Sequence, residues 1–153
     1  MSPRNEYGLP GVAHSYPSGA ESPRTKLDIE VLFTSERATQ SALRTAAKLA
    51  ASLGARIALI AVQVVPYPAP LDRPPIDVAF TQNRLRALAE RASVDATLRI
   101  YLTRDRREGL AGILKPRSLI VLGARKRWWP TAETRLARKL QSLGHEVVIA
   151  ETE

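Results

Sequence analysis

The residues best suited to chemistry form one short cluster late in the chain. Gly123 is followed closely by three basic residues at 125–127, and Trp128 and Trp129 come next. Cationic side chains can neutralise a phosphate group, and an indole can stack on a nucleobase. The alternative is structural, because a Trp-Trp-Pro segment can fold over apolar helix ends and leave the basic residues solvated. The cluster therefore indicates either a ligand site or a packed loop.

Signatures of common enzymes are absent from the sequence. It contains no G-x-x-x-x-G-K-[ST] phosphate loop, no G-x-G-x-x-G after a strand and no G-x-S-x-G elbow. Cysteine is absent, and His14 and His145 are far apart, so neither a thiolate site nor a histidine cluster is expected. Asp28 and Glu30 alternate with apolar residues, which favours solvated or edge-of-core roles. We assign no catalytic residue and no metal site.

Periodic apolar patterns predict the elements that must position these residues. In the segment 27–63, a short apolar strand is followed by Thr34 and Ser35, whose hydroxyls suit a helix start. Apolar residues then recur at helical spacing up to Gly54, which favours a left-handed stop. The next strand is almost continuously aliphatic, as expected of a central parallel strand. The predicted helices are 36–53, 77–93, a short one from 105 that ends before Pro116, and 132–143; the strands are 29–33, 57–65, 96–102, 118–122 and 146–151.

This alternation predicts a single-domain α/β fold: a five-stranded parallel open sheet with helices on both faces. A chain of 153 residues can build one ordinary core but not two. Residues 1–26 are rich in proline and glycine and are interpreted as a flexible N-terminal arm, and residues 27–153 as the α/β domain. No apolar run approaches the roughly 20 residues of a membrane span, so we expect a cytoplasmic protein without a membrane partner.

The pattern as a whole resembles the universal stress protein family. The resemblance rests on the strand–helix–strand opening, the passage LGARIALIAV, the strand SLIVLGAR and the closing TRLARKLQSLGHEVVIAE. It covers the whole of residues 27–153. It implies the parallel sheet already described, dimerisation through the last strand, and either ATP binding or its absence, because the family contains both kinds of member. The fold would then be of the adenine nucleotide alpha hydrolase type.

The family's ATP-binding members carry G-x2-G-x9-G-[ST] after the fourth strand, and this chain matches that pattern only in part. Glycines let backbone N–H groups approach phosphate. Gly123 matches the first glycine, but Lys126 replaces the second, and Glu133 stands where the last glycine would lie. Thr34 replaces the ribose-binding aspartate of the first strand. The ligand-binding residues implied together are Thr34, Ser35, Val62, Gly123, Arg125, Lys126 and Thr134, Val62 being at the strand end where adenine meets backbone.

Three functions remain open from the sequence. The first is a non-catalytic stress-response or regulatory domain that binds ATP, another adenine nucleotide or another phosphate ligand at the strand ends. The second is a homodimeric interaction module whose nucleotide site has decayed, as the replaced glycines favour. The third is a basic nucleic-acid-associated protein, because the net charge is +8 and the basic residues concentrate in the C-terminal half. No recognised nucleic-acid-binding motif accompanies that charge.

Overall fold

The computed structural model describes residues 27–70, 77–105, 109, 110, 112, 114, 118–125 and 131–152, and the backbone of 12–16. These residues form one six-stranded sheet in the order β1-β4-β3-β2-β5-β6. The strands are β1 (Val12–Tyr16), β2 (Asp28–Leu32), β3 (Arg56–Val64), β4 (Ala96–Thr103), β5 (Leu119–Arg125) and β6 (Glu146–Thr152).

The five strands predicted from the sequence run parallel, as expected. β2 lies at the centre, between β3 on one side and β5 on the other, with Val31 in register with Leu59 and with Val121. The prediction of a five-stranded parallel sheet is therefore confirmed for β2 to β6.

β1 is a difference from the prediction, because it falls within the segment interpreted as a flexible arm. It pairs antiparallel with β4, from Val12 opposite Leu102 to Tyr16 opposite Leu98. The sheet thus gains an antiparallel edge strand. The rest of the predicted arm lies outside the described residues.

The helices lie where the sequence predicts them to within two residues, and α1 begins and ends at its predicted signals. α1 (Glu36–Leu53) is capped by Ser35, whose hydroxyl accepts from the N–H of Ala38, and it ends at Gly54 with φ 62°. α2 (Val78–Arg91) begins after Asp77, and α4 (Ala132–Ser142) after Thr131, each of which caps its helix with a side-chain oxygen. Of the short helix predicted from residue 105, only 109, 110 and 112 are described as helical.

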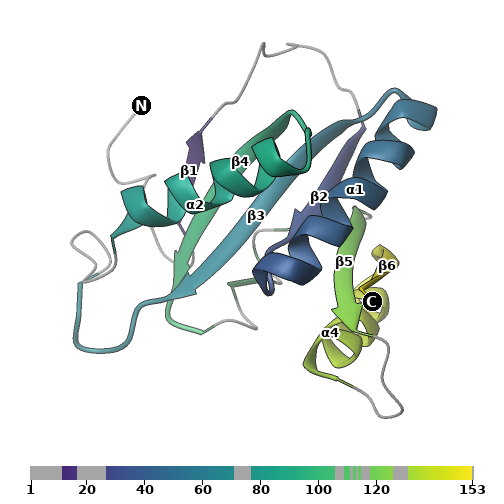
Figure 1. Ribbon diagram of the computed structural model, residues 1–153. Helices are drawn as coiled ribbons and strands as arrows, with labels where there is room; N and C mark the ends of the chain where they lie inside the picture. The colour runs from purple at the N-terminus through teal and green to yellow at the C-terminus, as the bar shows by residue number, and fades with distance from the viewer. Residues whose placement is uncertain are drawn as a thin grey trace.

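The helices cover both faces of the sheet, as predicted. Figure 1 shows α1 and α2 on one face and α4 behind β5 and β6. One apolar core lies under α1 and α2 and includes Leu43, Leu85 and Ile100. A second core lies on the α4 side and includes Leu122 and Leu140. The two cores bury the sheet between them, which explains why its strands are so continuously apolar.

The topology has one switch point, between β2 and β5. Counting only parallel strands, the order is 3-2-1-4-5, and the helix that follows β2 lies on the opposite face from the helix that follows β5. Open α/β sheets bind ligands in the crevice beyond the carboxyl ends of the strands at such a point. Thr34 and Gly123 both lie at this end of the sheet, as the sequence predicts.

Candidate functional site

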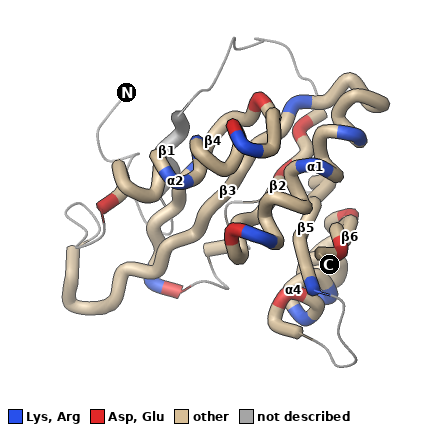
Figure 2. Tube along the Cα trace, in the orientation of Figure 1, with Lys and Arg blue, Asp and Glu red and all other residues tan. Residues whose placement is uncertain are grey.

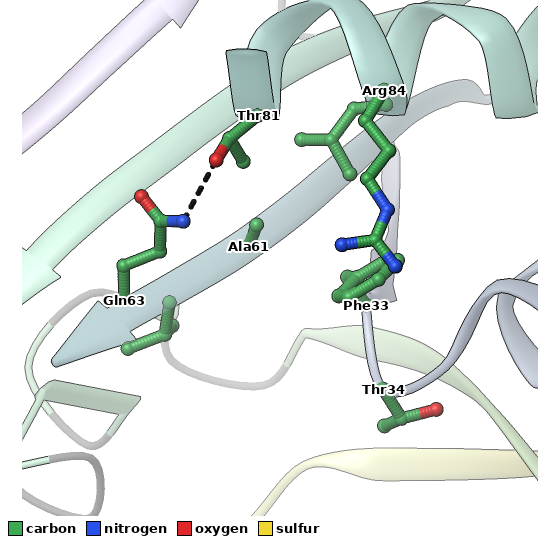
Figure 3. Close-up of a pocket in the computed structure, with 8 residues that line it drawn as sticks. Phe33, Thr34, Ala61, Gln63, Thr81 and Arg84 are labelled. Carbon is green, nitrogen blue, oxygen red and sulfur yellow. Dashed lines mark hydrogen bonds between the residues drawn. The ribbon is translucent and has the colours of Figure 1, made fainter. Parts of the chain in front are cut away.

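A pocket lies beyond the middle of the sheet, between the ends of two neighbouring strands and a helix. Its volume is about 160 Å³. Ala61 forms its floor, with the Gln63–Thr81 pair on one side and Arg84 above Phe33 on the other (Figure 3). Typical small-molecule sites measure roughly 300–1,000 Å³, so this pocket fits one ring or one phosphate-sized group. The lining residues are Phe33, Thr34, Ala61, Val62, Gln63, Thr81, Arg84 and Leu85.

The pocket exists because β2 leaves the sheet early while β3 continues. Phe33 still donates its N–H to the carbonyl of Ile60 at 2.8 Å. The next residue, Thr34, turns its N–H instead to the hydroxyl of Thr39 in α1, at 3.2 Å. The Thr34 hydroxyl itself is buried and has no hydrogen-bond partner among the residues that the structure describes. A buried hydroxyl without a partner is energetically costly.

One wall of the pocket is a short chain of hydrogen bonds between β3 and α2. The side-chain amide of Gln63 donates to the Thr81 hydroxyl at 2.8 Å, and that hydroxyl donates to the carbonyl of Asp77 at 3.5 Å. The Asp77 carbonyl can only accept, so the Thr81 oxygen is left to accept from the amide nitrogen of Gln63. The side-chain oxygen of Gln63 is buried and finds no partner within the described part of the chain.

The opposite wall carries a positively charged group held in a fixed position. Arg84 on α2 donates from Nε to Glu36 on α1 at 2.7 Å, and its guanidinium lies 5.4 Å from the centre of the Phe33 ring. Arg91 approaches the second oxygen of Glu36 at 3.9 Å. The pKa of Glu36 is lowered, first by the hydrogen bond from Arg84 and then by the charge of the same arginine. The two helices are therefore joined by an ion pair beside the pocket.

The structure brings some of the predicted ligand residues together. Thr34 and Val62 line the same pocket, from adjacent strands. Ser35 follows directly, but its hydroxyl caps α1 at 3.3 Å from the Ala38 nitrogen and does not line the pocket. The stretch from Thr34 to Ser35 thus combines one unused hydroxyl with one that stabilises the helix.

Gly123 has a packing role that the sequence does not predict. The predicted strand ends at residue 122, whereas Gly123 lies within β5 and is paired with Ala150. A Cβ atom at this position would lie only 1.9 Å from the carbonyl oxygen of Ala38. The glycine is therefore required by the close packing of α1 against β5. Arg125 is the last residue of β5 and is exposed.

Thr134, one of the predicted ligand residues, lies in the first turn of α4. The cap of α4 is Thr131, whose hydroxyl accepts the N–H of Thr134 at 3.3 Å and lies 3.0 Å from the Thr134 hydroxyl. The Thr134 side chain is thus already engaged. Lys126, Arg127, Trp128 and Trp129 lie outside the described residues.

The basic residues that the structure describes do not gather into one stripe. Figure 2 shows Lys and Arg spread over α1, α2 and α4, with acidic residues among them. Arg104 binds the carbonyl oxygens of Val65, Pro66 and Ala69 at 3.1, 3.2 and 2.5 Å, and it stacks on Tyr67 at 4.2 Å. This arginine therefore holds the loop after β3 in place.

Asp28 and Glu30, the two acidic residues of β2, are less exposed than a solvated role requires. The Asp28 side chain is 10% exposed and pairs with Arg56 at 3.2 Å, and Glu30 is 1% exposed. The pKa of Tyr101 is raised, mainly by burial and in part by the charge of Glu30. Glu30 therefore belongs to the α4-side core.

Among the described residues, no cluster of three or more metal-ligating side chains is present.

Sequence reasoning did not identify Gln63, Thr81 and Arg84 as pocket residues. Thr81 and Arg84 are one helical turn apart, and Arg84 directly precedes the buried Leu85. A polar pair at this spacing, beside the apolar stripe of a helix, is the signal that could have found them. The signal is incomplete, because it does not reveal which strand end the pair faces.

None of the helices in the described ranges is long and apolar enough to cross a membrane. No protein-family model matches this chain, and no curated protein matches it either.

Proposed function

We propose that this chain is a non-catalytic regulatory domain of the universal stress protein type, which binds an adenine nucleotide or another phosphate-bearing ligand. The observation that carries the proposal is that Thr34 and Val62 line one pocket at the carboxyl ends of adjacent parallel strands. These are the two positions at which the family resemblance places the ribose and the adenine.

The size of the pocket limits what can enter it. A space of about 160 Å³ admits one part of a nucleotide, and the remainder must extend along the strand ends. Gly123 contributes little to a phosphate cradle, because the backbone of α1 occupies the space next to its Cα atom. Ligand binding in this chain therefore depends on side chains more than on glycine-exposed backbone.

A thermal-shift series with ATP, ADP, AMP and a cyclic dinucleotide tests the proposal. A ligand that binds only the native state raises the melting temperature according to its concentration and dissociation constant. Thr34→Val removes the hydroxyl and keeps the shape of the side chain. The apparent affinity calculated from the shift should therefore fall by about 2- to 10-fold. Thr45→Val, the same change on α1 away from the pocket, serves as the control. Absence of any shift at millimolar concentrations would contradict ligand binding.

A homodimeric interaction module is the second candidate, and one observation favours it. β6 pairs on one side with β5, and no described strand covers its other side. Ile149 on this strand is 43% exposed although it is aliphatic. An uncovered strand edge is a template for pairing with a second copy.

Sedimentation over a range of concentrations tests the dimer. The wild-type chain should show a concentration-dependent dimer, and Ile149→Lys, which places a charge on the edge strand, should shift it to monomer. Leu53→Lys, at an exposed position on α1, is the matched control. A wild-type chain that stays monomeric at high concentration would contradict this candidate without affecting ligand binding.

A further inference from the structure

Arg84 is the one charged side chain among the described residues that line the pocket, and its position is fixed from two sides. Its Nε donates to Glu36 at 2.7 Å, and the guanidinium lies over the Phe33 ring at 5.4 Å. Figure 3 shows the side chain reaching from α2 past Ala61 to that ring. A long arginine side chain normally loses much rotamer freedom on binding, so these contacts reduce the cost of binding a ligand.

The part of Arg84 that recognises anions best is still available. Only Nε takes part in the hydrogen bond to Glu36, and within the described ranges no hydrogen bond from its terminal nitrogens is found. A guanidinium offers five N–H groups in a planar fork that matches the oxygens of phosphate or carboxylate. Arg84 thus presents most of its donors to an incoming oxyanion.

The local charge also favours an anion. Arg84 and Arg91 carry two positive charges and share the single negative charge of Glu36, so these three groups sum to one positive charge. Arg84 is 45% exposed, which lets its guanidinium face both the pocket and the solvent from which a ligand arrives. Glu36 is therefore an orienting group and at the same time a competitor for the arginine.

We propose that Arg84 is the anion-binding residue of this pocket: its terminal nitrogens bind a phosphate or similar oxyanion, and Glu36 holds the guanidinium in position. The inference deepens the proposed function and rests on its pocket. It differs from the family resemblance in the location of the phosphate, which it places at α2 and not at the glycine position of β5. The occupied space beside Gly123 is consistent with that displacement.

The test compares three probes on four variants by calorimetry: AMP, adenosine and pyrophosphate on Arg84→Gln, Arg84→Lys, Glu36→Gln and Arg86→Gln. Arg86 lies on the same helix and is exposed, does not line the pocket, and loses the same charge. Arg84→Gln should weaken AMP and pyrophosphate by about 10- to 100-fold, and adenosine by less than about twofold. Arg84→Lys should lie between wild type and Arg84→Gln, because it keeps the charge and loses the fork.

Glu36→Gln should change the affinity for AMP and pyrophosphate in the opposite direction. It keeps a hydrogen-bond acceptor for Arg84 and removes the competing charge, so AMP and pyrophosphate should bind about 2- to 10-fold more tightly. Arg86→Gln should bind like the wild type. The melting temperature of each variant without ligand shows that the fold is retained, and Arg84→Lys remains informative if Arg84→Gln fails to fold.

The outcomes separate the two proposals. Equal AMP binding by wild type and Arg84→Gln overturns the role of Arg84 and leaves the nucleotide function standing. Pyrophosphate binding that requires Arg84, without binding of AMP or adenosine, supports the anion site and contradicts a nucleotide ligand; free phosphate compounds are then the ligand class. No binding of any probe overturns both.

Discussion

Replacement of Gly123 by alanine tests whether this glycine serves packing or ligand binding. The added Cβ would lie 1.9 Å from the carbonyl oxygen and 2.4 Å from the carbonyl carbon of Ala38. Both are backbone atoms of α1, so no side-chain rotation can relieve the contact. Either α1 or β5 has to move, and α1 is packed over the central strands by Leu43 and Ala46, which are fully buried.

The change in the free energy of unfolding caused by Gly123→Ala is the sum of two opposing contributions. Overpacking of a well-packed core costs about 1–3 kcal/mol, and a contact with backbone atoms belongs at the upper end of that range. Replacing glycine by alanine also restricts the unfolded chain, which offsets about 0.4–1 kcal/mol. We therefore expect a loss of about 2 kcal/mol in the free energy of unfolding. For a domain of this size the melting temperature should fall by roughly 4–8 °C.

Urea unfolding and calorimetry of Gly123→Ala measure this loss, with Gly112→Ala as the control. A Cβ at Gly112 meets nothing within 4 Å, so alanine there should be neutral or stabilising by up to about 1 kcal/mol. The double variant Gly123→Ala with Ala38→Gly should not recover stability, because the clash is with the backbone of residue 38. An unchanged melting temperature for Gly123→Ala, or rescue by Ala38→Gly, would refute the packing explanation.

Three further predictions concern other contacts. Arg104→Ala removes the donor to three loop carbonyls and should cost about 1–3 kcal/mol, with faster amide exchange confined mainly to the β3–α2 loop; uniform exchange would contradict a local role. His145→Leu leaves the Ser118 N–H without its acceptor at a buried site and should cost about 1–3 kcal/mol in urea unfolding, whereas His145→Asn should retain part of the bond. The pKa of Glu36 is depressed below its usual 4.5 by Arg84, so its stabilisation is present above that pH and lost as the pH falls through the lowered value. The difference in melting temperature between wild type and Glu36→Gln should therefore be constant near neutral pH and shrink in acid, and a difference that grows in acid would contradict this sign.

Local signals in the sequence were sufficient where they act locally. The hydroxyl of Ser35 and the left-handed Gly54 define both ends of α1, and both are visible as residue types in a fixed order. The aliphatic run of β3 identifies a strand covered on both faces. These features predict the parallel sheet and its helices, and they place Thr34 and Val62 at strand ends.

Features that depend on the approach of distant segments could not be predicted in the same way. A glycine at the end of an apolar run reads as a turn, and only the passage of α1 over β5 shows that Gly123 is a packing residue. β1 has little apolar alternation of its own, and its pairing is determined by the neighbouring β4. Arg84 reads as a solvated helix residue until Phe33 and Glu36 are brought beside it.

The tight fit of Gly123 beneath Ala38 also determines how the pocket can open. Glu36, which holds Arg84 beside the pocket, stands only two residues before Ala38, so this end of α1 is fixed against the backbone of β5. α2 has no such anchor in the described ranges and holds on through side chains such as Leu85 and Leu88. Side-chain packing can slide where backbone contact cannot. A widening of the pocket to admit a larger ligand therefore requires a shift of α2, while α1 keeps its position on the sheet.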